Sequence, residues 1–202
     1  MAKYEGGILA PVHGKVGSVV GSNWRAIDYV RSYTSHVKNP RTTAQQAQRG
    51  RLSKATGIAR QLLPGARPGL TARCQVRSEF NELVRQLMGL ESNVEQLDRL
   101  VFSSGPRAGV LLGAFTKPQA AGKVEVSFTS QPSAAMDRSD DDAVYVVYYD
   151  AKANRAAVAM APRSDGKVEL TVHDKAEGLV YLFAYVRSSR GVGSATTAVK
   201  VQ

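Results

Sequence analysis

The stretch Val37-Lys-Asn-Pro-Arg-Thr-Thr-Ala-Gln-Gln-Ala-Gln-Arg49 separates two kinds of sequence pattern. Before it, Gly- and Val-rich sequence alternates as β-strands do, and after it apolar residues recur with a helical period. Pro40 disfavours helical backbone at the preceding residue, so no helix is expected to enter from the N-terminal side. Thr42 and Thr43 are candidate N-caps, and a glutamine follows three residues after each, as a capping box requires. We therefore predict a strand, a rigid elbow and a helix start.

The charge of the chain is one-sided. It has 27 Lys and Arg against 17 Asp and Glu, a net charge of +10, and the first 75 residues hold the whole excess, with 12 basic residues against Glu5 and Asp28. Such a distribution favours a polyanion or an acidic protein surface as partner, and a merely solubilising surface is the alternative. The candidate residues for binding a polyanion or partner are Arg25, Arg31, Lys38, Arg41, Arg49, Arg51, Lys54 and Arg60.

Cysteine usage and the apolar runs indicate the compartment. Cys74 is the single cysteine, so no internal disulfide can form, as expected in a reducing compartment. The first residues lack the apolar core of a signal peptide, and no run approaches the ~18 apolar residues of a membrane helix. We therefore expect a cytoplasmic protein, or one that is associated with a virion, and no membrane partner.

Residues 7–34 are expected to form β-structure, with a hairpin turn at Gly21-Ser22. In the second strand Trp24 is then expected on the same face as Asp28, with Tyr29 on the other face. Neither face is cleanly apolar, so the hairpin must pack on the helices that follow or on another copy of the chain. The glycines of residues 14–21 lack the spacing of a phosphate-binding loop and are better explained by a twisted or closely approached strand.

Two amphipathic helices are expected next. The first runs from residue 43 to about 63 and stops at Pro64, where Pro-Gly-Ala-Arg-Pro-Gly is typical of a turn. Arg51 falls in its apolar sector and is expected to snorkel or to pair. The second helix spans residues 71–88 with Thr71 as its cap, and the short connection favours an antiparallel pair. Residues 89–98 form a third short helix or a loop. The expected apolar face of the first helix consists of Ala44, Ala47, Leu52, Ala55, Ile58, Ala59, Leu62 and Leu63.

From residue 99 the pattern changes to short strands separated by turn signals. The candidate strands are residues 100–103, 109–115, 123–129, 143–149, 156–161, 167–172, 179–187 and 195–201. Strands at this spacing are typical of an immunoglobulin- or fibronectin-like β-sandwich. Residues 144–149 and 180–186 are apolar on both faces and are the predicted central strands. The predicted fold class is therefore α+β, with a basic β-hairpin and helical domain at 1–98 and a β-sandwich domain at 99–202.

Several motifs carry a resemblance. Residues 14–32, with Gly-Lys-Val-Gly-Ser-Val-Val-Gly-Ser-Asn-Trp-Arg, and the following Lys-Asn-Pro-Arg-Thr-x-x-Gln-Gln-Ala resemble an uncharacterised family of Bacteroidota, as do Arg163-Ser-Asp-Gly-Lys-Val-Glu-Leu-Thr-Val and the last strand. The shorter Asn-Pro-Arg-Thr element also resembles proteins of phage and prophage regions. This resemblance implies an architecture and a mobile-element context, and it brings no catalytic residues.

No catalytic, metal or cofactor site is predicted. His13, His36 and His173 have no zinc-ligand spacing, and the acidic run 139–142 lacks the alternating pattern of a calcium loop and is expected to be a solvated turn. No nucleophile elbow or recognisable pair of catalytic carboxylates is present. We expect a protein that is not an enzyme.

Two functions remain open. The first is a structural or assembly protein derived from a phage or mobile element. It would self-associate or bind an assembly partner through the hairpin and helices, with the sandwich as a spacer or docking module. The second is a non-specific DNA- or RNA-binding protein that contacts phosphates through the basic residues named above.

Overall fold

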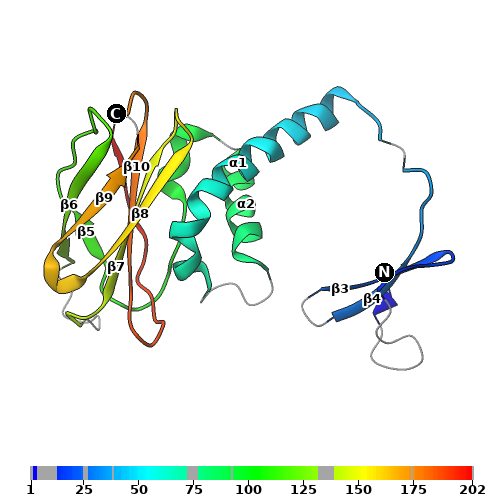
Figure 1. Cartoon of the computed structure of the whole chain (residues 1–202), viewed down its shortest axis with the longest axis horizontal. Coiled ribbons are helices and arrows are strands. Elements are labelled where there is room, and N and C mark those ends of the chain that lie inside the picture. The colour runs from blue at the N-terminus through cyan, green and yellow to red at the C-terminus, as the bar shows by residue number, and fades with distance from the viewer. Residues whose placement is uncertain are drawn as a thin grey trace. The chain divides into compact units, whose positions relative to one another are not determined.

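The computed structural model describes residues 2–3, 13–24, 27–37, 39–71, 77–91, 93–131, 139–173 and 175–201. The chain forms two compact units, Met1–Gln45 and Gln46–Gln202. Figure 1 shows a small sheet at the N-terminus, helices and a larger β-structure. The fold mixes helices with antiparallel sheets, so the predicted α+β class is confirmed.

The first unit contains a four-stranded antiparallel sheet in the order β1-β4-β3-β2. Its strands are β1 (Ala2–Lys3), β2 (Gly14–Val16), β3 (Val19–Trp24) and β4 (Ile27–Ser32). The predicted turn at Gly21-Ser22 is wrong, because both residues lie inside β3 and Gly21 pairs with Gly14. The turn is at Gly17-Ser18, and Gly17 has a φ of 58°, as the first position of a type II′ hairpin turn requires.

The elbow ends in the predicted capping box. The Gln45 backbone N–H donates to Thr42 Oγ1 at 3.3 Å, and the Thr42 backbone N–H donates to Gln45 Oε1 at 3.4 Å. Helix α1 (Thr43–Thr71) begins at the residue after Thr42. The reciprocal bonds satisfy backbone donors that the first helical turn leaves without a partner, which fixes where the helix starts.

Helix α1 continues through Pro64 and Pro68, so the predicted stop at Pro64 is wrong. Each proline removes a backbone donor and disturbs the preceding turn, which costs stability. Close packing offsets this cost, because Gly65 and Gly69 are buried where α1 meets the β-structure. A Cβ at Gly65 would lie 2.9 Å from Val147 Cγ1, and one at Gly69 would lie 2.6 Å from the carbonyl oxygen of Phe102. Burial of the last two turns therefore overrides the local turn signal.

Helix α2 (Glu79–Gly89) starts later than predicted. Its N-cap is Ser78, whose hydroxyl accepts a bond from the Asn81 backbone N–H at 3.2 Å. The predicted cap Thr71 is instead the last residue of α1, and its hydroxyl donates to a carbonyl one turn earlier. Residues 72–76, including Cys74, lie outside the described part. Residues 89–98 were expected to form either a short helix or a loop, and the structure has a 3-10 helix there, η1 (Val94–Arg99).

Two sheets follow. One has three strands in the order β5-β6-β9 and the other four in the order β11-β10-β7-β8. Their strands are β5 (Val110–Leu112), β6 (Gly122–Ser130), β7 (Ala143–Asp150), β8 (Arg155–Pro162), β9 (Lys167–Val172), β10 (Val180–Arg187) and β11 (Thr197–Val201). The 3-10 helix η2 (Arg163–Asp165) lies between β8 and β9. Residues 100–103 form no strand, contrary to prediction. The backbone N–H groups of residues 101–103 donate hydrogen bonds to the side chains of Gln86 and Thr196 and not to a neighbouring strand.

The four-stranded sheet is buried on both faces, which gives the second unit three layers. Val146 and Leu182 face a core shared with the three-stranded sheet, whereas Val147 and Phe183 face a core shared with α1, α2 and η1. The predicted central strands are confirmed as β7 and β10, since both are buried on both faces. Helices and β-structure on either side of residue 98 thus share one core, whereas the predicted division placed them in separate domains. That the two helices form an antiparallel pair stays a prediction.

Two buried tyrosine hydroxyls join the four-stranded sheet to the helical layer. Tyr185 donates to the carbonyl of Gly65 in α1 at 2.6 Å, and Tyr181 donates to the carbonyl of Val94 in η1, also at 2.6 Å. Each bond satisfies a buried hydroxyl that would otherwise cost about 1–3 kcal/mol. The two tyrosines therefore hold the four-stranded sheet against α1 and η1.

We expect the second unit to lose stability in alkali. Burial raises the pKa of Tyr148 and of Tyr181 to about 12, and burial also raises the pKa of Tyr149 and of Tyr185, all from the ordinary value of 10.0. Above pH 10 the unfolded chain releases these protons before the folded chain does, so the free energy of unfolding decreases as pH rises toward 12. Urea unfolding followed by circular dichroism should give a falling midpoint over this range, and a constant midpoint from pH 9 to 11 would contradict the expectation.

Candidate interaction surfaces

The strand register divides the sheet of the first unit into two chemically different faces. Trp24 pairs with Ile27, so it lies on the same face as Tyr29 rather than on the face of Asp28, and the predicted assignment is wrong. The aromatic face consists of Lys15, Val20, Ser22, Trp24, Ile27, Tyr29 and Arg31, with Tyr33 continuing the line of β4. The valine face consists of Gly14, Val16, Val19, Gly21, Asn23, Asp28, Val30 and Ser32.

Large side chains on the aromatic face are open to solvent. Trp24 is 52% exposed, Ile27 43% and Tyr33 45%, although side chains of these types are usually well buried. The ammonium group of Lys15 lies 3.6 Å from the centre of the Tyr33 ring, a cation–π contact. Arg31 is also exposed. The face thus presents aromatic rings and positive charges side by side.

The valine face has a different composition. Val16 is 62% exposed and Val19 41%, and the two are paired across the β2–β3 hairpin. In the described part of the first unit, this face has no basic residue, and its one acidic residue, Asp28, accepts a hydrogen bond from Asn23 at 2.8 Å. The valine face is therefore apolar and close to neutral.

The described members of the predicted basic set are divided between the two units. Arg25 and Lys38 lie outside the described residues. Arg31 and Arg41 are exposed in the first unit, and the remaining four lie on α1 in the second unit. These four are Arg49, Arg51, Lys54 and Arg60.

On α1 the basic residues spread around the helix. Arg49 and Arg60 are 11 residues apart, which places them within about 20° on the helix surface, whereas Lys54 lies about 140° from Arg49. Arg51 pairs with Glu91 at 3.8 Å, which confirms the expectation that it snorkels or pairs. Helix α1 has no acidic residue in its sequence, so it is basic along its length. Its first turns, including the predicted apolar residue Leu52, are largely exposed.

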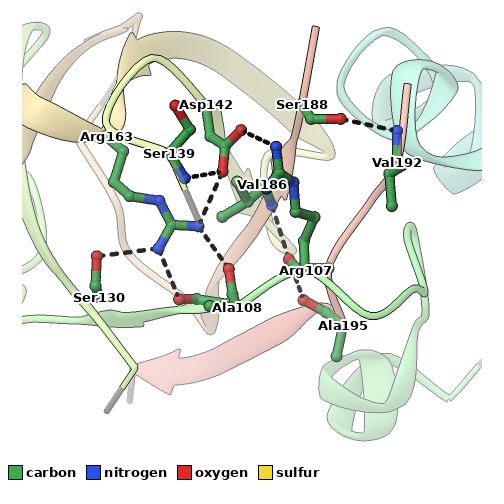
Figure 2. A network of polar contacts seen from close by, with 12 residues as sticks. Arg107, Ala108, Ser130, Ser139, Asp142, Arg163, Val186, Ser188, Val192 and Ala195 are labelled. Atoms are coloured by element: carbon green, nitrogen blue, oxygen red, sulfur yellow. Dashed lines mark hydrogen bonds and ion pairs between the residues drawn. The ribbon is translucent and has the colours of Figure 1, made fainter. Parts of the chain in front are cut away.

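A buried ion cluster joins the ends of the two large sheets (Figure 2). The carboxylate of Asp142 accepts hydrogen bonds from Arg107 at 2.9 Å and from the Ser139 backbone N–H at 3.0 Å, and it lies 3.8 Å from Arg163. Arg163 also donates to Ser130 Oγ at 3.0 Å and to the carbonyl of residue 108. Asp142 is only 2% exposed, so the prediction of a solvated turn at 139–142 is wrong at this residue.

The chain belongs to the family of unknown function DUF6266. The family model matches residues 11–198, nearly the whole chain, and this confirms the predicted membership of an uncharacterised family. No curated protein and no solved structure shows a significant similarity to the chain.

This member of the family offers no evident metal site or membrane helix where its structure is described. Within that part, no group of three or more His, Cys, Asp or Glu residues is placed to hold a metal ion. His13, His36 and His173 are all exposed. None of the helices, over the residues searched, is long and apolar enough to cross a membrane.

A polar cleft of about 290 Å³ opens at the ends of β7 and β10, beside Tyr145 and Arg187. Arg187 donates to the carbonyl of Pro68 at 2.8 Å, close to the C-terminal end of α1. The last turn of α1 has no basic residue of its own, so Arg187 supplies the positive charge that a helix C-terminus favours. This side chain is thus explained by its role in the fold.

Proposed function

We propose that the protein is a non-enzymatic structural or assembly protein whose first unit is the interaction module. The second unit, with its own two cores, serves as a rigid spacer or docking module. The main support for this proposal is that almost none of the described residues of the first unit is buried. Over residues 13–24, 27–37 and 39–45, only Gly21 is buried, so the described part of this sheet has no apolar side chain buried in a core.

We expect one apolar face of this sheet to be buried against a partner. A hairpin alone is marginally stable in water, and a small sheet gains stability when its hydrophobic face is buried. Covering one face removes apolar area from water at about 25 cal/mol per Å². Val16 and Val19, which face water here, are the kind of side chains that such a contact would bury.

The occupant that we propose for the valine face is the valine face of a second copy of the chain. Charge supports this choice. The valine face has no basic residue in its described part, so two valine faces can pack together without repulsion between like charges. Two aromatic faces would place Lys15 and Arg31 near the same residues of the other copy, where like charges repel. Gly14 and Gly21 pair on the valine face and leave room for close approach of another sheet. Packed sheets lie about 10 Å apart, so such a contact would bury the exposed valines.

Val19→Asp is expected to prevent self-association. The unmodified chain should show at least the mass of two chains by light scattering at high concentration, and the variant should show the mass of one. The reason is that a dimer would bury two uncompensated carboxylates on the valine face.

Ile27→Asp is the matched control for this variant. Val19 is 41% exposed and Ile27 43%, each begins a strand, and each change adds the same charge, but they lie on opposite faces. Ile27→Asp should keep the mass of the unmodified protein. A strictly monomeric unmodified chain, or loss of association in both variants alike, would contradict the proposal.

Nucleic-acid binding is the second candidate function. It is favoured by the exposed Arg31 and by α1, which has basic residues and no acidic ones. Phosphate contacts by several Lys and Arg side chains should give a slope of several units in log K against log salt concentration. A flat slope, or no binding to DNA or RNA at low salt, would remove this candidate.

We also propose the immunoglobulin/fibronectin class for the sandwich. Its support is the strand order, in which the first, second and fifth strands form one sheet and the other four form the second sheet. The Asn-Pro-Arg-Thr element supports descent from a phage or mobile element, and with it a place in the cytoplasm or in a virion. Capsid or tail genes beside this gene would favour the assembly role, and replication or partition genes the nucleic-acid role.

A further inference from the structure

We propose that the aromatic face of the first unit binds single-stranded nucleic acid by stacking bases on its rings. This inference rests on the second candidate function and adds the site and the form of the ligand. The residues that carry it are Trp24, Tyr29 and Tyr33 as stacking surfaces, with Lys15 and Arg31 as phosphate contacts.

Rings and charges on this face follow one line. Alternate residues of a strand lie on one face about 7 Å apart. Along β4 these positions are Ile27, Tyr29 and Arg31, and Tyr33 follows at the same interval, held by its backbone N–H to the carbonyl of residue 18 at 2.7 Å. Trp24 lies opposite Ile27 at one end of the line. Flat side chains and cations therefore alternate along a direction that an extended strand can follow.

The charge distribution of the sheet favours phosphate on this face. Its described residues include Lys15 and Arg31 and no acidic residue. Asp28, the acidic residue in the described part of the first unit, lies on the valine face and accepts a bond from Asn23. A backbone that runs over the aromatic face thus meets positive charge without a nearby carboxylate from the same sheet.

The exposed rings of Trp24 and Tyr33 favour a single strand over other polyanions as the ligand. In a duplex the bases are stacked on each other and offer only their edges in the grooves, so rings on a sheet gain nothing from stacking. An acidic peptide has charges for Lys15 and Arg31 but no flat bases. Trp, Tyr and Arg are also common in protein interfaces, so a protein partner is the alternative that the experiment must separate.

Trp24 gives a direct readout, because it is the only tryptophan in the chain. Titration with single-stranded oligothymidine should quench its fluorescence. A duplex of equal length and polyglutamate should bind more weakly and leave the fluorescence largely unchanged. Replacing a stacking ring by Ser should weaken oligothymidine binding about tenfold or more, because base stacking on aromatic side chains contributes that much.

The variants separate stacking, charge and assembly. Tyr33→Ser should weaken binding, whereas Tyr33→Phe keeps the ring and should bind nearly as the unmodified chain does. Arg31→Ala should reduce the salt slope by about one unit. Val19→Ser on the valine face should leave oligothymidine binding unchanged. Oligomeric mass, measured on the same Tyr33→Ser sample, should not change, so failure of this inference is distinct from failure of self-association.

Three outcomes would overturn the inference. One is the absence of Trp24 quenching with oligothymidine at low salt in the unmodified protein, which needs no variant to fold. Another is equal affinity for polyglutamate and oligothymidine, as expected of a docking surface for an acidic protein. The third is equal loss of binding in Tyr33→Phe and Tyr33→Ser, since stacking needs only the ring.

Discussion

Asp142→Ala is expected to lower the free energy of unfolding of the second unit by about 3–5 kcal/mol. The change removes the carboxylate that lies between Arg107 and Arg163 and leaves two guanidinium groups without their shared counter-charge. Breaking a buried ion pair from one side has a cost of this size because the remaining charge stays desolvated. The cluster also connects the start of β7 with η2 and with the segment before β5 (Figure 2). Its loss should therefore weaken the contact between the two sheets.

Asp141→Ala is the control for this prediction. Asp141 is the preceding residue in the same acidic run but is exposed, so its removal should change the free energy of unfolding by less than about 0.5 kcal/mol. Urea unfolding followed by circular dichroism measures both variants. Similar small effects in the two would mean that the buried cluster does not stabilise the fold.

Gly65→Ala is expected to destabilise the second unit even though alanine is the better helix former. The added Cβ would lie 2.9 Å from both Val147 Cγ1 and Val158 Cγ2, closer than side-chain carbons approach each other. Overpacking of this kind costs about 1–3 kcal/mol, against a gain of about 1 kcal/mol from helix propensity. The net effect should be a lower melting temperature, with α1 displaced from the sheet.

Gly50→Ala, in the same helix, should have the opposite sign. A Cβ at Gly50 would have no neighbour within 4 Å, so only the propensity gain of up to about 1 kcal/mol remains. The pair of variants thus separates packing from propensity. Stabilisation by both changes would contradict the close contact of α1 with β7 and β8.

Local signals in the sequence predicted the elements whose boundaries are set locally. The capping box at Thr42 and the alternating strand β9 are examples, because both depend on neighbours within a few residues. The end of α1 could not be predicted in this way. Pro-Gly-Ala-Arg-Pro-Gly has the local chemistry of a turn, and only burial of Gly65 and Gly69 on residues far along the chain keeps it helical.

The predicted faces of the first sheet depended on which of two similar dipeptides forms the hairpin turn. Gly17-Ser18 and Gly21-Ser22 are the same dipeptide, and the choice decides which strand Trp24 joins. Because side chains alternate along a strand, this shift moved Trp24 to the face of Tyr29. The net charge was readable from the sequence, but its arrangement was not. The predicted basic residues divide between two units, and the exposed aromatic residues beside Arg31 were the signal that a count of charges misses.

We propose that a second copy of the chain completes the first unit. Hydrogen exchange at several protein concentrations tests it most directly. Backbone amides of β3 and β4 should exchange more slowly as concentration rises, while those of β7 and β10, inside the second unit, should not change. Exchange in β3 and β4 that is independent of concentration, across a range that spans the self-association measured by light scattering, would contradict the claim.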